Sequence, residues 1–140
     1  MVSSPKTDFL ASHIVSGYTT VVGTEDTQFW SKRVGVTALN DPTMISGETQ
    51  EGVVMLAEVL QKIDDPLALV NKARAKAPRL VITLPNEFLW DAKFKPMQNP
   101  QHKRTYDTDD LAEPLEQANL KYKIELIEYQ GWAFWAVEAT

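Results

Sequence analysis

The feature that most constrains the fold is a set of short apolar runs in which hydrophobic residues follow one another without alternation. Gly52–Ala57 and Arg79–Leu84 are the clearest of these runs, and Tyr18–Gly23 and Val34–Leu39 are β-branched segments of similar length. Continuous apolar runs are typical of strands that are covered on both faces, as in parallel sheets. The sequence therefore predicts a buried, mostly parallel sheet.

Segments with helix signals separate these runs. Thr24–Arg33 opens with a threonine cap and early acids and closes with bases, which suits a helix dipole. Asp65 and Pro66 provide a cap and a first residue for a second helix. Asp107–Ala118 carries an apolar stripe at helical spacing, interrupted by Pro114, which should kink it. Because strands and helices alternate, we expect a three-layer α/β sandwich with helices on both faces of the sheet.

The end of the chain departs from this alternation. Tyr122–Leu126 and Trp132–Val137 are strand-like and are joined by the turn at Gln130 and Gly131. Strands joined this tightly must be antiparallel. Asn119, just before them, suits the left-handed position that follows a helix. The expected sheet is therefore mostly parallel and ends in a C-terminal antiparallel hairpin.

Composition bounds the class of protein. The 140 residues are 44% hydrophobic and 24% charged, which is typical of one globular domain, here expected over residues 1–140. The chain has no cysteine, which excludes disulfides, thiolate zinc sites and iron–sulfur clusters. Its net charge of −5 argues against a nucleic-acid partner. The sequence shows no membrane-length apolar segment, signal peptide or paired metal-ligand spacing, so we expect a soluble, cytoplasmic protein with no membrane or metal partner.

A long segment without periodicity, Pro85–Tyr106, lies between the fourth apolar run and the last expected helix. Connections of this length in compact domains are often functional. The segment is also rich in ring side chains, namely those of Trp90, Phe94, His102 and Tyr106. It is the first place to look for residues that contact a substrate.

Four segments in the second part of the chain occur in a distinctive order, and they are Val53–Leu60 with Ile63–Pro66, Leu80–Asn86, Asn99–Leu111 and Gln117–Leu120. In this order they resemble segments of the class I S-adenosylmethionine (SAM)-dependent methyltransferases. They match the family's fourth strand with the opening of the next helix, its fifth strand, the start of the following helix, and the end of that helix. The resemblance implies a Rossmann-like sheet, in which the closing hairpin supplies the reversed last strand.

The resemblance also implies a SAM site at the carboxyl ends of the first strands. The residues that would contact the cofactor are Gly23, Thr24 and Glu25 after the first strand, Asn40 and Asp41 after the second, and Glu58 after the family's fourth strand. The acid after the second strand would accept hydrogen bonds from the ribose hydroxyls. Two of these positions have simpler interpretations, since Gly23 can merely end a strand and Asp41 can merely form a turn.

In the same family, a small-molecule methyl acceptor would bind near the ring-rich segment. His102 is the candidate general base, and Trp90 and Tyr106 are candidates to line the acceptor pocket. Each can instead serve only to organise its own loop. His13, in an expected N-terminal helix, is a poor catalytic candidate.

Two functions follow. The first is SAM-dependent methyl transfer to a small molecule. The second is a non-catalytic methyltransferase-like module with a structural or assembly role, favoured by the single glycine of the first turn, the displaced acid at Asp41 and the lack of a third strand between Met44 and Gly52. A sheet without that strand has an exposed edge, so we also expect a homodimer or a covering N-terminal segment.

Overall fold

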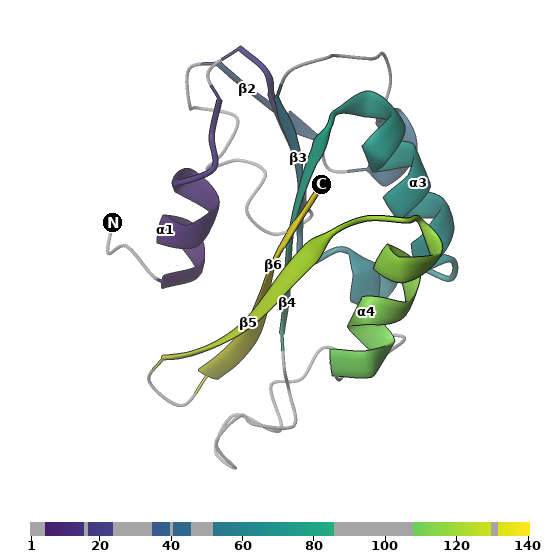
Figure 1. Cartoon of the computed structure of the whole chain (residues 1–140). Coiled ribbons are helices and arrows are strands. Elements are labelled where there is room, and N and C mark those ends of the chain that lie inside the picture. Colours follow the sequence, from purple (N-terminus) through teal and green to yellow (C-terminus); the bar gives the residue numbers. More distant parts are fainter. Residues whose placement is uncertain are drawn as a thin grey trace.

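The computed structural model describes residues 5–15, 17–23, 35–39, 41–45, 52–85, 108–129 and 132–140. Within them, a sheet lies between helices on its two faces (Figure 1). Helix α1 (Pro5–Ala11) lies on one side, and α3 (Pro66–Lys76) and α4 (Thr108–Gln117) lie on the other. This arrangement confirms the three-layer α/β sandwich. The helix predicted over Thr24–Arg33 lies outside the described residues.

The sheet has the strand order β2-β1-β3-β4-β6-β5. Strands β1 to β4 are parallel to their neighbours, and β6 is antiparallel to both β4 and β5. The C-terminal antiparallel hairpin is therefore confirmed. The strands are β1 (Thr19–Val22), β2 (Val36–Leu39), β3 (Val53–Ala57), β4 (Arg79–Pro85), β5 (Tyr122–Tyr129) and β6 (Trp132–Ala139).

The strand order changes direction at β1. The chain passes from β1 to β2 on one side and then crosses back to β3 on the other side of β1. The carboxyl ends of β1 and β3 are therefore the topological switch point of the sheet. Among the described residues no strand lies beyond β2, so β2 and β5 are the edges of the sheet.

The continuous apolar run of β3 is explained by two clusters of buried side chains. Val54 and Leu56 belong to the larger cluster, which includes Leu111 and Leu115 of α4. Alternate residues of β3, such as Met55, belong to a second cluster that includes Leu10 of α1. Successive side chains of a strand point to opposite faces, so a strand that is covered on both sides must be apolar throughout.

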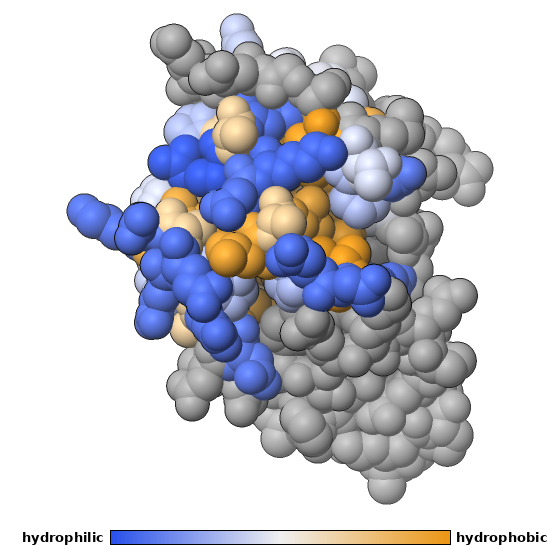
Figure 2. All heavy atoms as spheres, turned by 90° about the vertical axis from the view of Figure 1, so that its right-hand side faces the viewer, coloured by the Kyte–Doolittle hydropathy of each residue, from blue (hydrophilic) through white to orange (hydrophobic). Residues whose placement is uncertain are grey.

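The surface that carries α3 and α4 has both apolar and hydrophilic areas (Figure 2). Figure 2 shows the side that carries α3 and α4, where an apolar area in the centre is bordered by hydrophilic residues. In the described part of the chain, no helix combines the length and the hydropathy that crossing a membrane requires.

Two residues at helix ends, Asp65 and Asn119, have the capping roles that their residue types predict. The Asp65 carboxylate accepts a hydrogen bond from the Ala68 N–H at 3.1 Å and begins α3. At the end of α4, Asn119 has φ +58°, and the Leu120 N–H donates to the Leu115 carbonyl at 3.0 Å. This is the Schellman form of helix ending. Helix α4 continues across Pro114 as one element.

Candidate functional site at the carboxyl edge of the sheet

Gly23 lies where β1 ends, between β2 and β3. Its N–H donates to the Leu39 carbonyl at 3.0 Å, which ties the end of β1 to the end of β2. A Cβ at this position would lie 3.2 Å from the Ala57 carbonyl oxygen and 3.3 Å from the Ala57 Cβ. The missing side chain therefore lets β1 pack closely against β3. This contact gives Gly23 a packing role in addition to any role in binding.

Glu58 follows β3 at the same edge. Its φ is +58°, and its N–H donates to the Thr83 carbonyl at 2.9 Å, so the β3–β4 pairing continues while the chain turns. Left-handed backbone is uncommon for residues other than glycine, and such residues cluster at functional sites. Glu58 is half-buried and directly follows Ala57, the residue that a side chain at position 23 would meet.

Asp41 lies just after β2 and begins the short 3-10 helix η1 (Pro42–Met44). Its Oδ1 accepts hydrogen bonds from the Thr43 N–H at 2.9 Å and from the Thr43 hydroxyl at 2.8 Å. These two bonds, and more weakly the charge of Lys72, hold the pKa of the exposed Asp41 carboxyl below its usual value. Asp41 is therefore a turn residue, as one of its two interpretations proposed, and it remains an anion at neutral pH.

The segment that carries Asp41 is also tied to a helix. The Lys72 ammonium on α3 donates to the Thr43 carbonyl at 2.9 Å. The structure thus brings Gly23, Asp41 and Glu58 to the ends of three neighbouring strands on one edge of the sheet. The other predicted site residues lie outside the described residues; these are Thr24, Glu25, Asn40, Trp90, His102 and Tyr106.

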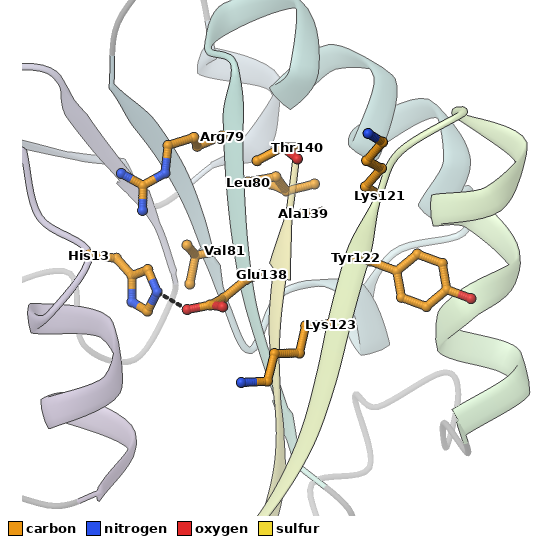
Figure 3. Close-up of a pocket in the computed structure, with 10 residues that line it drawn as sticks. All are labelled: His13, Arg79, Leu80, Val81, Lys121, Tyr122, Lys123, Glu138, Ala139 and Thr140. Atoms are coloured by element: carbon orange, nitrogen blue, oxygen red, sulfur yellow. Dashed lines mark hydrogen bonds and ion pairs between the residues drawn. The ribbon is translucent and has the colours of Figure 1, made fainter.

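A cavity of about 330 Å³ lies at the opposite edge, where β4 begins and β6 ends (Figure 3). In it, His13 Nε2 contacts the Glu138 carboxylate, and His13 Nδ1 lies 2.8 Å from the Phe9 carbonyl oxygen. The contact at Nε2 joins two residues that lie 125 positions apart in the sequence. This contact holds the end of α1 against β6, away from the carboxyl edge.

Sequence reasoning missed two of these features. His13 and Glu138 are 125 positions apart, and nothing local to either residue predicts that they meet. The conformation of Glu58 was missed because left-handed positions are sought at glycine and asparagine. Among the described residues, no group of three or more acids and histidines is placed to hold a metal ion.

No family model matches the sequence. No curated protein matches it closely enough to count as a relative. Solved structures do match. A SAM-dependent methyltransferase from Archaeoglobus fulgidus has a TM-score of 0.67 and 12% identity, over 95% of this chain and 90% of that one. One from Aquifex aeolicus has a TM-score of 0.64 and 16% identity, over 96% and 89%.

A third match is the magnesium protoporphyrin IX methyltransferase of Synechocystis with bound SAH. Its TM-score is 0.59 and its identity 10%, over 96% of this chain and 78% of that one. All three are similar over nearly the whole of this chain, although few residues are identical. The chain therefore has the fold of the class I SAM-dependent methyltransferases.

Proposed function

We propose that this protein is a SAM-dependent methyltransferase that acts on a small-molecule acceptor. The observation that carries the proposal is the switch point between β1 and β3, with Gly23 and the left-handed Glu58 at its carboxyl edge. Ligands of open α/β sheets bind outside the carboxyl ends of the strands at such a point. The fold shared with methyltransferases supports the choice of SAM as the ligand.

The acids of this edge fit the cofactor chemically. When bound, SAM supplies a methyl group on a positively charged sulfonium, and anionic side chains favour that charge. Asp41 is held as an anion, and both of its hydrogen bonds from Thr43 use Oδ1. In the proposal, Asp41 also accepts hydrogen bonds from the ribose hydroxyls, and Glu58 contributes to the negative charge around the cofactor.

The acceptor side of the proposal rests on the sequence. Trp90 and Tyr106 line the acceptor pocket, and His102 removes the proton that the acceptor loses on methylation. Methyl transfer depends mainly on aligning the acceptor with the methyl group. A small-molecule acceptor agrees with the neighbour that is named for magnesium protoporphyrin IX.

Thermal unfolding with millimolar SAM or S-adenosylhomocysteine tests the cofactor. A ligand that binds only the folded state stabilises it, by about 2.7 kcal/mol when its concentration is about 100 times its Kd. We expect a higher melting temperature with either ligand. An unchanged melting temperature for both would overturn the proposed cofactor and leave the structural role.

A matched pair of variants tests the site. Asp41→Asn keeps an oxygen that can cap η1 but removes the charge and one acceptor, so the shift with SAM should fall by more than half. Asp65→Asn neutralises a capping acid of the same kind on α3 and should keep the full shift. Equal shifts in the two variants would show that Asp41 has only its turn role.

The structural alternative has a specific observation in its favour. The space that Gly23 leaves is filled by Ala57, and Asp41 is already engaged by Thr43, so both residues have roles that need no cofactor. A folded protein that fails to bind either ligand would therefore favour the alternative function, a non-catalytic methyltransferase-like module with a structural or assembly role.

A further inference from the structure

Strand β5 is a long edge strand with apolar side chains in solvent. In the described part of the chain it pairs only with β6, along its full length of eight residues. Two of its side chains, Tyr122 and Leu126, are each 37% exposed, and the Tyr122 hydroxyl donates to the Glu116 carboxylate of α4. Edge strands of this length present unpaired backbone groups that can accept another strand. The question is which strand the outer side of β5 would fit.

The backbone groups that face outward follow from the pairing on the inner side. The residues Lys121 and Thr140 exchange two hydrogen bonds, of 2.9 and 2.8 Å. Hydrogen-bonded pairs alternate along an antiparallel ladder, so Lys123 and Glu125 also bond to β6. The residues between them, including Ile124, direct their N–H and carbonyl groups to the outer side. A new strand would therefore bond to Tyr122, Ile124 and Leu126.

We propose that a second copy of this chain occupies this edge, with its own β5 antiparallel and a two-fold axis at Ile124. In this register Ile124 lies opposite Ile124 of the second copy. Tyr122 lies opposite Leu126, and Lys123 lies opposite Glu125. All three outward-facing residues then form hydrogen-bonded pairs, and the two sheets become one continuous sheet.

The charges on one face support this register. Lys123 lies opposite Glu138 of β6 within its own sheet. In the dimer, Glu125 of the second copy lies on the other side of Lys123, so each lysine stands between two acids. Cross-strand pairs of opposite charge stabilise a sheet, and like charges directly opposite one another destabilise it.

The apolar residues on the other face support it as well. Within one sheet, Leu126 lies opposite Trp135, Ile124 opposite Val137, and Tyr122 opposite Ala139. In the proposed register these rows continue across the axis, because Leu126 meets Tyr122 of the second copy and Ile124 meets itself. The exposed apolar surface of the edge is thus covered by its own counterpart.

Neighbouring registers do not share this complementarity. An axis at Lys123 or at Glu125 places like charges directly opposite one another. An axis at Leu126 places Ile124 opposite Glu128 and Glu125 opposite Ile127, which pairs charged residues with apolar ones. The other edge, β2, offers only four residues. The homodimer expected from the sequence is therefore assigned here to β5 rather than to the β2 edge.

Single-cysteine variants test the register directly, because the chain has no cysteine of its own. In an antiparallel hydrogen-bonded pair the Cα atoms are about 5.5 Å apart, which suits a disulfide. Ile124→Cys should therefore form a covalent dimer under mild oxidation. Leu126→Cys should not, since its two copies would be roughly 14 Å apart along the strands. Cross-linking of Leu126→Cys alone would overturn the register.

Charge variants test the interface without a covalent bond. Lys123→Glu and Glu125→Lys each create two like-charge pairs across the axis, so each variant should dimerise about tenfold more weakly than the native chain. An equimolar mixture of the two should regain the dimer, because each acid then faces a base. Light scattering measures the state, and circular dichroism confirms folding.

The native chain itself gives the decisive result. A dimer that the two charge variants weaken and their mixture restores supports the proposal. A native chain that is monomeric at several hundred micromolar would overturn it, as would a dimer that is insensitive to both substitutions. Neither result depends on SAM, so the dimer and the proposed cofactor can fail separately.

Discussion

Two glycines near the amino ends of β1 and β3 have positive φ but different surroundings. Gly52 has φ +106°, and a Cβ there would lie 2.1 Å from the Tyr18 carbonyl oxygen. That carbonyl accepts a hydrogen bond from the Val53 N–H at 3.0 Å, where the pairing of β1 with β3 begins. Gly17 has φ +85° and open space around its would-be Cβ. A side chain at position 52 would therefore suffer both a steric clash and backbone strain, whereas one at position 17 would suffer backbone strain alone.

We therefore expect unequal effects from the same substitution. Gly52→Ala should lower the free energy of unfolding by at least about 3 kcal/mol, because backbone strain and a clash with β1 act together. Gly17→Ala should lower it by only about 1 kcal/mol, the cost of the left-handed backbone alone. Urea denaturation of both variants measures the difference. Equal losses would show that the contact between Gly52 and Tyr18 relaxes at little cost.

The roles of single residues were predictable where their partners lie nearby in the sequence, and they were not where the partners lie far away. Asp65 and Asn119 have the cap and left-handed roles that their positions in the sequence suggested. Asp41 has the turn role that its position suggested, because Thr43 two positions later completes the motif, and its cofactor role stays a prediction. Glu58 adopts its conformation because β4 binds its N–H, and a partner 25 positions away leaves no local signal.

At the scale of elements, the end of α4 shows how a helix is stopped and its chain redirected into β5. The N–H groups of Asn119 and Leu120 donate to the carbonyls of Glu116 and Leu115, each at 3.0 Å. Leu115 and Leu120 are both buried in the same apolar cluster. The left-handed residue thus satisfies the last carbonyls of the helix and returns the chain to the core.

This ending predicts a graded response at Asn119. Asn119→Ala should lower the free energy of unfolding by about 1 kcal/mol, because alanine lacks the side-chain compensation that asparagine has at positive φ. Asn119→Gly should leave it nearly unchanged or raise it slightly. Chemical denaturation compares the two variants. A glycine variant less stable than the alanine variant would contradict the assigned role of the left-handed backbone.

The elements themselves were largely predictable because each has a strong local pattern. All six strands of the described residues lie within or overlap the runs expected from the sequence, and α3 begins at its predicted cap. The orientation of the hairpin followed from its short connection. The order of the strands could not be read from local patterns, because it depends on pairing between segments that are far apart in the sequence.

At the scale of the whole molecule, the helices of the described residues cover the two faces of the sheet unequally. Two helices and the larger cluster cover one face, whereas the described cover of the other includes the seven-residue α1 with Leu10 in the smaller cluster. Beside Leu10, the contact between His13 and Glu138 holds the end of α1. The α1 side should therefore be the easier of the two to open.

Hydrogen exchange can measure this asymmetry. Leu10→Ala should cost about 2–3 kcal/mol and speed exchange mainly in α1. Leu115→Ala removes a side chain of the same size from the larger cluster and should speed exchange throughout the sheet. The same pattern of exchange in both variants would show that the two faces open together.

The place of β6 in the sheet also has a consequence for synthesis on the ribosome. Strand β5 leaves the ribosome before β6, yet it reaches the sheet only through β6, which lies between it and β4. The parallel strands β1 to β4 can therefore pair while translation continues, whereas β5 must wait for a strand made after it. The nascent chain thus passes through a stage in which β4 has not yet paired with β6 and neither side of β5 has a partner. A chaperone that shields unpaired strands would be most useful at this stage.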